Sequence, residues 1–575
     1  MTTEKDLTGY PSIDKPWLSK YPDFLLSQRK IYKTIYENIC AVWGNEDETI
    51  INYYDTNIST KQFFCRVDEI KKSLFAMGIK SGDSIAIALE SVPEFLELFL
   101  ACEQLGCSVK NYLDGVSNGI DLIKGCTANI YITHDYITQK DVDLIYNETH
   151  IKNIILVNPL FSVTNTSGVR NNIKDVINER YTGVLINDTR NIQWEDFLEL
   201  GIDIANVPTP TKQNILFSAF TSGTSGEPKE VLHTSASLMG VINQLALFPF
   251  HEKGKDTWML TILPPTLVAV VVAMMFYPLA DGKQLILNPF CKLEDLDIEM
   301  MHFEPNCWGL IPIFFDVLLE SKKIPESYDM GYFKLFGFGA EPMTNKFITR
   351  VQDFLDAHNC KAPFGSGYGQ SEGGSDFTVC MGREMMSYGS AGMPLIDTTI
   401  SVFVPGTTQE LPYGQVGEIC KTGPGIMVGY SDSEKTKEVL KLHDDGKVWL
   451  HTGDTGFMTP EGLLFVLGRQ GVNIYPDKTV FPLAMENKVV EFQGVKEAIV
   501  VSGVDKEHSG YEVPYLFVVP EKEQNKEVLL GGLKEYIKTA ISEEEQPKDT
   551  FIIDKKPISH FKTDRKYLQK EFNLL

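Results

Sequence analysis

The sequence predicts an α/β protein with a large N-terminal domain of parallel-rich sheets flanked by helices and a small C-terminal α+β domain. Short apolar strands alternate with amphipathic helices, which is typical of parallel sheets covered by helices. The chain has 575 residues, more than one hydrophobic core usually fills, so at least two domains are expected. The pattern changes after Gly468-Arg469. We therefore place the large domain at residues 1–467, a hinge at 468–472 and the small domain at 473–575.

The alternation is clearest in the first third of the chain. Ser59 is a good N-cap for a helix that ends at Gly78, because apolar residues follow at steps of three and four. A strand over 84–89, a helix over 93–105 and strands over 130–132 and 154–157 come next. In the small domain the patterns predict strands over 497–502 and 515–519 and helices over 526–539 and 566–572.

Net charge and cysteine content indicate which partners and which compartment to expect. A formal net charge of −24 disfavours nucleic acid or an anionic membrane as a partner, because like charges repel over long range. The ten cysteines form no CxxC pair and no dense framework, so we expect reduced thiols in a cytoplasmic protein. No apolar stretch follows the polar N-terminus, and prolines interrupt the apolar segment 258–280, so we expect neither a signal peptide nor a membrane span.

A loop rich in glycine and hydroxyl side chains follows a short apolar run, 215–217. Glycines let successive backbone N–H groups turn inward as an anion-binding nest, while hydroxyls and a lysine add donors and positive charge. Glu227-Pro228 separate the lysine from the second glycine, so the loop is not that of an ordinary P-loop NTPase. The loop residues expected to bind phosphate are Thr221, Ser222, Gly223, Thr224, Ser225, Gly226 and Lys229.

Three later motifs carry residue types suited to a nucleotide. Tyr368-Gly369-Gln370-Ser371-Glu372 offers an aromatic ring for stacking and a carboxylate for Mg²⁺. Thr452-Gly453-Asp454 places an aspartate on a turn, where its two oxygens can accept from two adjacent ribose hydroxyls. Arg469 can steady the same ribose or a phosphate.

Together, and in this order, these motifs resemble those of the adenylate-forming superfamily, which includes acyl- and aryl-CoA synthetases, peptide-synthetase adenylation domains and beetle luciferases. The resemblance extends over about residues 55 to 570. It implies a mobile C-terminal domain, ATP and Mg²⁺ as cofactors, and CoA or a carrier-protein phosphopantetheine as acceptor. It also implies that Gly339-Ala340-Glu341, together with Tyr368, Gly369 and Ser371, binds the nucleotide, and that Glu372 is both a catalytic residue and the metal ligand.

The terminal segment Pro557 to Tyr567 resembles the family's last motif, which carries the catalytic lysine. Lys566, three residues after Thr563, takes that role in our assignment, and Lys562 is the alternative. A solvated basic tail is the structural alternative, because lysines and arginines cluster here.

Three positions depart from the family pattern. Glu230 follows the loop lysine where glycine is usual, and Gly471 replaces an acidic or lysine hinge residue. Segment 474–482 is one residue short and places Lys478 near a position where the family has glycine over the thioester tunnel. The last change puts the thiol-transfer step in question more than the adenylation step.

The acid pocket is expected to be apolar. Amino-acid-activating relatives carry an aspartate in the segment that is Pro264 to Val271 here, and this chain has no acid there. We expect Leu267, Val268 and Gly367 to contact the acid. The predicted function is ATP-dependent activation of a hydrophobic carboxylic acid and its transfer to CoA. Two alternatives remain open: a stand-alone adenylation enzyme that loads a carrier protein, and a non-catalytic nucleotide-binding homologue.

Overall fold

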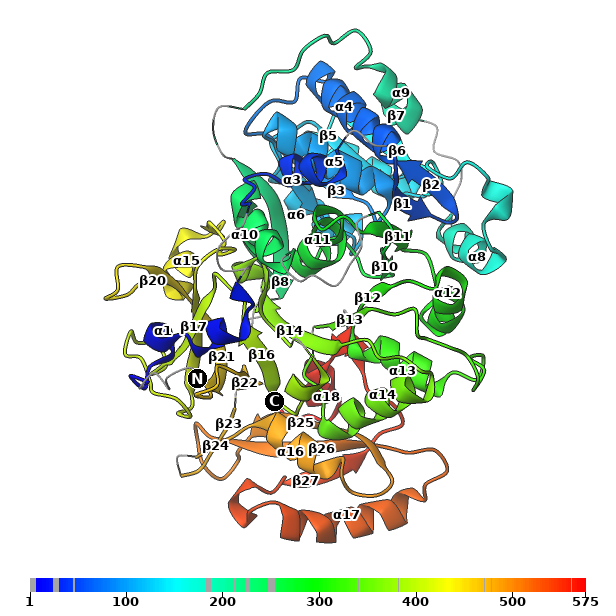
Figure 1. The fold of residues 1–575 in the computed structure, drawn as a ribbon. Helices are drawn as coiled ribbons and strands as arrows, with labels where there is room; N and C mark the ends of the chain where they lie inside the picture. The colour runs from blue at the N-terminus through cyan, green and yellow to red at the C-terminus, as the bar shows by residue number, and fades with distance from the viewer. Residues whose placement is uncertain are drawn as a thin grey trace.

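The fold is taken from a computed structural model, shown in Figure 1. It describes residues 7–23, 30–44, 47–181, 188–210, 212, 214–222, 228–246, 254–339, 341–380, 382–469, 471–476, 478–559 and 561–575. The C-terminal segment, coloured orange to red, lies at the opposite end of the molecule from the sheet that contains β3, β5 and β6. Among the described residues, no helix combines the length and apolarity that crossing a bilayer would need.

One sheet of eight strands is built mainly from the first third of the chain. Its central strands are parallel, as the alternating pattern predicted, and β8 pairs antiparallel with β9. The order is β19 (Gly429–Tyr430), β9 (Pro228–Thr234), β8 (Ile215–Ser222), β4 (Ser108–Asn111), β3 (Ser84–Ala88), β5 (Ile130–His134), β6 (Asn153–Val157) and β7 (Asn191–Gln193).

A second sheet of fourteen strands is parallel at one end and antiparallel at the other. The parallel part is β14 (Phe364–Gln370), β13 (Leu335–Phe338), β12 (Cys307–Leu310), β10 (Thr257–Thr261), β11 (Gln284–Asn288) and β1 (Thr49–Tyr53), with β2 (Thr56–Ser59) antiparallel at the edge. The antiparallel part is β17 (Thr399–Phe403), β18 (Gly417–Thr422), β21 (Val448–Met458), β22 (Leu464–Gly468), β16 (Ser390–Pro394) and β15 (Ser375–Val379), and β20 (Leu440–Leu442) pairs with β21.

Helices cover these sheets. In α4 the Ser59 side chain accepts from the Gln62 backbone while Gln62 accepts from the Ser59 backbone, a capping box that starts the helix. The larger helices are α3 (Ile35–Trp43), α4 (Thr60–Ala76), α5 (Pro93–Leu105), α6 (Val116–Lys124), α7 (Gln139–Glu148), α8 (Asn171–Arg180), α9 (Trp194–Glu199), α10 (Ser235–Leu245), α12 (Leu296–Phe303), α13 (Pro312–Glu320), α14 (Asn345–Ala357) and α15 (Ser433–Val439).

Several short helices and helical turns complete the large domain. The apolar segment 258–280 ends in a π-helical turn, η3 (Val270–Phe276), followed by α11 (Tyr277–Ala280). The lead segment, which has no clear period, forms α1 (Pro11–Asp14) and η1 (Pro16–Lys20). The remaining turns are η2 (Thr166–Gly168), η4 (Leu293–Asp295), η5 (Ser371–Gly373) and η6 (Arg383–Met385).

After β22 the chain builds its own apolar cluster, which runs from Val472 to Ile541. A three-stranded sheet, β25 (Val495–Val504), β26 (Glu512–Pro520) and β27 (Asp549–Ile552), is joined by two hairpins, β23 (Val472–Ile474) with β24 (Lys478–Val480) and β28 (Ile558–Ser559) with β29 (Lys562–Thr563). The helices are α16 (Pro482–Val489), α17 (Lys526–Ala540), η7 (Glu543–Glu545) and α18 (Arg565–Glu571).

Polar contacts join this C-terminal part to the rest. Lys346 Nζ on α14 contacts the carbonyl oxygen of Val495 at 2.7 Å and Glu521 Oε1 at 2.8 Å. Glu320, the last residue of α13, pairs with Lys496 and with Lys522. These contacts hold β25 and the residues that follow β26 against α13 and α14.

Candidate nucleotide and acid site

Asp454 in β21 is the centre of a hydrogen-bonded group. Its Oδ2 accepts from the Tyr368 hydroxyl and from Gln370 Nε2, each at 2.7 Å. Its Oδ1 accepts from Arg469 Nε at 2.9 Å. Tyr368 and Gln370 share one face of β14 because side chains alternate along a strand. A carboxylate has about four acceptor positions, so three donors fix its orientation and leave capacity for a ligand hydroxyl.

The charges around Asp454 agree with this arrangement. Burial and the Asp454 carboxylate raise the pKa of the Tyr368 hydroxyl well above its usual value, so Tyr368 remains a donor. Burial tends to lower the pKa of Arg469, but the Asp454 carboxylate outweighs it and the net shift is upward. The predicted pair of Asp454 and Arg469 is therefore brought together as a charged pair, and Tyr368 lies beside it.

Glu372 lies beside Tyr430 of β19. The Tyr430 hydroxyl donates to Glu372 Oε1 at 2.7 Å, and Lys229 Nζ lies 5.1 Å from the centre of the Tyr430 ring. Pairing of β19 with β9 brings Tyr430 to the strand that begins beside Lys229. A carboxylate beside a lysine fits a Mg²⁺ ion that bridges phosphate oxygens, because Mg²⁺ prefers carboxylate and phosphate ligands.

The predicted phosphate loop is partly described. Thr221 and Ser222 end β8, and Lys229 opposes Thr221 in β9, so the two arms of the loop are adjacent. Gly223, Thr224, Ser225 and Gly226 lie outside the described residues, as does Ala340. Glu230, which replaces the usual glycine, forms a 2.5 Å ion pair with Lys110 of β4. This pair directs Glu230 toward β4.

The tip of hairpin β28–β29 reaches the loop after β13. The backbone N–H of Thr563 donates to Glu341 Oε1 at 2.7 Å. Burial lowers the pKa of Lys562, the carboxylates of Glu341 and Asp454 oppose that shift, and the Arg469 guanidinium adds to it. The Lys562 residue as a whole is exposed. Burial is nevertheless the largest influence on the pKa of its ammonium group. Lys562 thus lies among the predicted nucleotide-binding residues.

Lys566 occupies a different environment. It lies in the first turn of α18 and is exposed, while its neighbour Arg565 pairs with Glu486 of α16 at 2.9 Å. The turn of the hairpin holds Phe561 with φ of 62°, a left-handed conformation that glycine adopts most easily. Phe561 therefore occupies a glycine-like position directly before Lys562.

The predicted acid-binding residues differ in exposure. Val268 is buried, whereas Leu267, three residues before η3, is 40% exposed. Gly367 lies in β14, and a Cβ atom there would collide with Asp376 Oδ1 of the neighbouring β15. Burial raises the pKa of Asp376 to about 6. A partly buried carboxylate thus lies against the strand of the predicted pocket, which segment 264–271 alone did not indicate.

Lys421 is the nearest balancing charge. Its Nζ donates to the carbonyl oxygens of Gly373 and Pro424 at 2.9 and 2.8 Å, and it lies 4.6 Å from the Phe377 ring centre. Burial lowers its pKa to about 7, while Asp376 acts in the opposite direction. The lysine fixes the turn that follows Glu372, because Gly373 belongs to that turn.

The altered segment after the hinge forms the hairpin β23–β24. Lys478 pairs with Glu544 and Glu545 at 3.3 and 3.0 Å. A Cβ on Gly471 would collide with Thr479 of the opposite strand. Close packing within this hairpin therefore requires glycine at 471.

Two contacting residues had no predicted role. Gln370 bonds both Asp454 and the Thr452 carbonyl oxygen, at 2.7 and 2.9 Å. Because side chains alternate along a strand, the two-residue spacing could have placed Gln370 on the same face of β14 as Tyr368. Tyr430 links Glu372 and Lys229, but only the pairing of β19 with β9 brings them together.

Comparison with known proteins gives matches along almost the whole chain. Residues 40–431 match the AMP-binding enzymes, and residues 484–560 match the C-terminal domain of AMP-binding enzymes. The 4-coumarate–CoA ligase CCL1 of Humulus lupulus is 25% identical over 566 residues, which cover 94% of this chain and 93% of the relative.

Solved structures share the fold. The anthranilate CoA ligase AuaEII, in complex with anthranoyl-AMP, superposes with a TM-score of 0.76 at 14% identity, covering 96% of this chain and 98% of its own. The o-succinylbenzoate CoA synthetase of Bacillus subtilis, in complex with ATP and magnesium, gives 0.67 at 19% identity, covering 94% and 100%.

Proposed function

Because this chain belongs to the family of AMP-binding enzymes, we propose that it activates a hydrophobic carboxylic acid with ATP and transfers it to CoA, with Lys562 as the catalytic lysine. The family match confirms the adenylate-forming superfamily, the fold class and the AMP-forming acid–CoA ligase class predicted from the motifs. What remains a proposal is the role of each residue, the acid and the acceptor.

The observation that carries the proposal is the position of Lys562. It follows the hairpin turn that docks on Glu341, and its pKa responds to Asp454 and Arg469. Those two residues are the proposed ribose site. A cation that arrives there on the C-terminal hairpin, and not on the sheets, is suited to bridge an acid carboxylate and the α-phosphate. This argument favours Lys562 over Lys566.

The adenylation step joins two anions. A carboxylate oxygen of the acid forms a bond to the α-phosphorus of ATP, and the bond from that phosphorus to the pyrophosphate oxygen breaks. Positive charge placed where negative charge develops is usually the largest contribution to such catalysis. Lys562 would contact the carboxylate and the α-phosphate, and Lys229 with the loop from Thr221 would contact the β- and γ-phosphates.

Two further sites support the same step. Glu372 would hold Mg²⁺, which neutralises phosphate charge when bound. Asp454 would accept from the ribose hydroxyls while Arg469, Tyr368 and Gln370 fix its orientation. In the thiol step the CoA sulfur forms a bond to the acyl carbon, the bond to the AMP oxygen breaks, and the thiol proton leaves to solvent.

We propose an acid with an apolar body. Val268 and the η3 turn are apolar, and the related ligases named above are a 4-coumarate–CoA ligase and an anthranilate CoA ligase. Asp376 adds a condition, because a partly buried carboxylate behind Gly367 favours a polar or hydrogen-bonding substituent at that side of the acid. An aromatic acid with one such substituent satisfies both features.

We also propose that residues 468–472 act as the hinge, since β22 ends at Gly468 and the separate C-terminal cluster begins at Val472. All ten cysteines are free, which agrees with the cytoplasmic location expected from the sequence.

The test is ATP–pyrophosphate exchange with straight-chain acids, phenyl-substituted acids and the standard amino acids, followed by thioester assays. We expect exchange with aromatic or aliphatic acids and thioester formation with CoA. Each buried methylene should improve affinity by about 0.8 kcal/mol, roughly fourfold. Exchange without CoA thioester would favour a carrier protein. Nucleotide binding without exchange would favour the non-catalytic alternative, and exchange with a free amino acid alone would contradict the proposed acid.

A further inference from the structure

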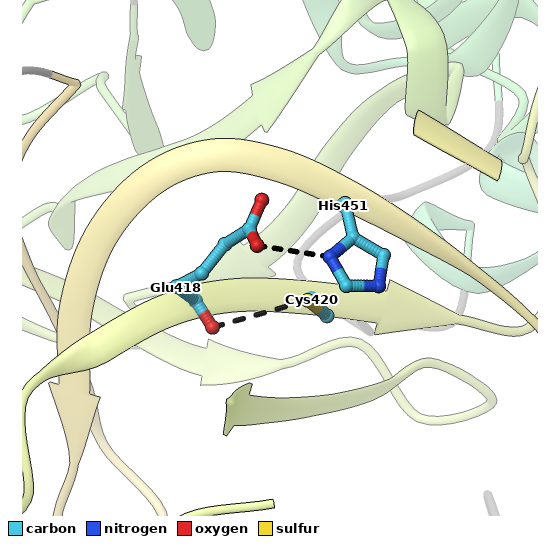
Figure 2. A group of neighbouring side chains, drawn as sticks. All are labelled: Glu418, Cys420 and His451. Carbon is cyan, nitrogen blue, oxygen red and sulfur yellow. Dashed lines mark hydrogen bonds and ion pairs between the residues drawn. The ribbon is translucent and has the colours of Figure 1, made fainter. Parts of the chain in front are cut away.

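Glu418, Cys420 and His451 form a compact group outside the proposed nucleotide site (Figure 2). Cys420 of β18 directly opposes His451 of β21. Opposed residues on an antiparallel pair have side chains on the same face, and Glu418 shares that face because it lies two residues from Cys420. The pairing of two strands thus gathers a carboxylate, a thiol and an imidazole.

The distances within this group are short. Glu418 Oε2 lies 2.9 Å from His451 Nδ1, and one ligand atom from each of the three side chains lies within 4.8 Å of the other two. Cys420 is 0% exposed and His451 is 3% exposed. In Figure 2 the Glu418 carboxylate points toward the His451 ring, and Cys420 lies beside both.

A fourth residue fixes the other side of the imidazole. His443 Nε2 lies 3.0 Å from His451 Nε2, and the His443 ring stacks on Trp449 at 20°. The tight turn between β20 and β21 positions His443, whose backbone bonds Lys447 and Gly446. Metal-binding histidines commonly donate their second ring N–H to an acceptor, which sets the tautomer and raises the basicity of the ligand nitrogen.

We propose that Glu418, Cys420 and His451 bind one zinc ion, with His443 as a positioning residue that accepts from His451 Nε2. Thiolate, imidazole and carboxylate are the three ligand types that Zn²⁺ takes in proteins, at about 2.0–2.3 Å. Ligand atoms on one tetrahedral zinc are about 3.3–3.7 Å apart. Atoms that already lie within 4.8 Å need only small side-chain movements to reach those separations.

The proposed ion has a structural role. Glu418 Oε1 accepts from the backbone N–H of Gly453 at 3.2 Å, directly before Asp454. The Thr452 hydroxyl donates to the Ile419 carbonyl oxygen at 2.6 Å, between the two ligands on β18. Zinc would therefore join β18 to β21 at the start of the segment that carries the proposed ribose ligand, without contacting nucleotide or acid.

The experiment uses the full chain, expressed with zinc and passed through gel filtration. Elemental analysis should find about one zinc per chain, and Cys420→Ser or His451→Gln should lower it to near zero. The control is Cys65→Ser, which removes the exposed thiol most suited to adventitious metal and should leave the zinc content unchanged. His443→Phe should weaken zinc affinity by about 10–100-fold in a chelator competition, because it removes the second-shell acceptor.

Cobalt substitution makes the test independent of variant folding. In the wild-type chain, Co²⁺ bound by the three side chains and one water should give visible bands of a four-coordinate site and a near-ultraviolet thiolate charge-transfer band, and Cys420→Ser should lack the latter. Absence of both spectra, or zinc content that follows Cys65 and not Cys420, would overturn the proposal. The group would then be a hydrogen-bonded chain from Glu418 through His451 to His443.

Discussion

The backbone N–H of Thr563 donates a 2.7 Å hydrogen bond to Glu341 Oε1, a residue 222 positions earlier in the chain. This bond joins the C-terminal hairpin to the loop after β13. It also fixes the neighbour of Thr563, Lys562, close enough to Asp454 and Arg469 for their charges to act on its pKa.

Lys562→Ala should lower the pyrophosphate exchange rate by about 10²–10³-fold, because one preorganised group that stabilises transition-state charge contributes about that much. ATP binding should change little. The matched control is Lys566→Ala, an exposed substitution on the same segment, for which we expect a change of at most about twofold. If Lys566→Ala abolishes exchange and Lys562→Ala does not, the first lysine assignment from the sequence is the right one.

Asp454→Asn should weaken ATP and AMP equally, because both contain the ribose. Loss of a charge-assisted hydrogen bond costs roughly 1.5–3 kcal/mol, which corresponds to about a 10–100-fold rise in the dissociation constant. Calorimetry with each nucleotide measures this. Asp353→Asn, an exposed aspartate on α14, is the control and should bind like the wild type. A change for ATP alone would rule out the ribose role.

Gly367→Ala should raise the KM for the acid while leaving the KM for ATP unchanged, because the added methyl group meets Asp376. Overpacking typically costs about 1–3 kcal/mol, or roughly 5–150-fold in affinity. Adding Asp376→Ala should recover part of the loss, since it removes the colliding carboxylate. Steady-state kinetics on both variants measures the two KM values. An unchanged KM for the acid in Gly367→Ala would mean that β14 does not line the acid pocket.

His233 predicts a pH dependence of stability. Burial, assisted by the charge of Lys421, lowers its pKa to about 4, and its Nε2 lies 2.7 Å from the Ser371 carbonyl oxygen. The folded chain keeps His233 neutral while the unfolded chain binds a proton below about pH 6.5. Its contribution, roughly 3 kcal/mol, is therefore complete above pH 6.5 and is lost progressively as the pH falls toward 4.

Urea unfolding at pH 7 and pH 5 measures this contribution. The free energy of unfolding should fall between these pH values in the wild type, and the fall should be smaller in His233→Gln. An equal fall in both proteins would mean that other groups cause the pH dependence.

The sequence predicted the elements well where local signals agree. The capping residues of α4 and the αL glycine after α5 fix both helices, so their positions followed from residue type alone. The motifs placed Asp454 and Arg469 at the same ribose, but they did not predict the ion pair between the two side chains. What the sequence did not contain was contact between separate strands and turns: the Asp376 carboxylate behind Gly367, and the Tyr430 hydroxyl on Glu372.

The lysine assignment shows the same limit in a single segment. Counting three residues from Thr563 favoured Lys566. In the folded chain, Phe561 directly before Lys562 adopts a left-handed backbone conformation that glycine favours. This turn places Lys562 at the nucleotide site. A conformation carried by an unusual residue type is visible only once the chain is folded.

Phe561 has a consequence for how the domains move. Its ring lies against Phe314 of α13, at 6.3 Å between ring centres, and packs on the main apolar cluster of the large domain. If the C-terminal domain rotates at the proposed hinge, this ring must first be exposed to water. Apolar contacts weaken on cooling, so the undocked population should grow as the temperature falls. The enzyme would then favour adenylation in the warm and release of the hairpin in the cold, which makes temperature a control on the relative rates of its two half-reactions.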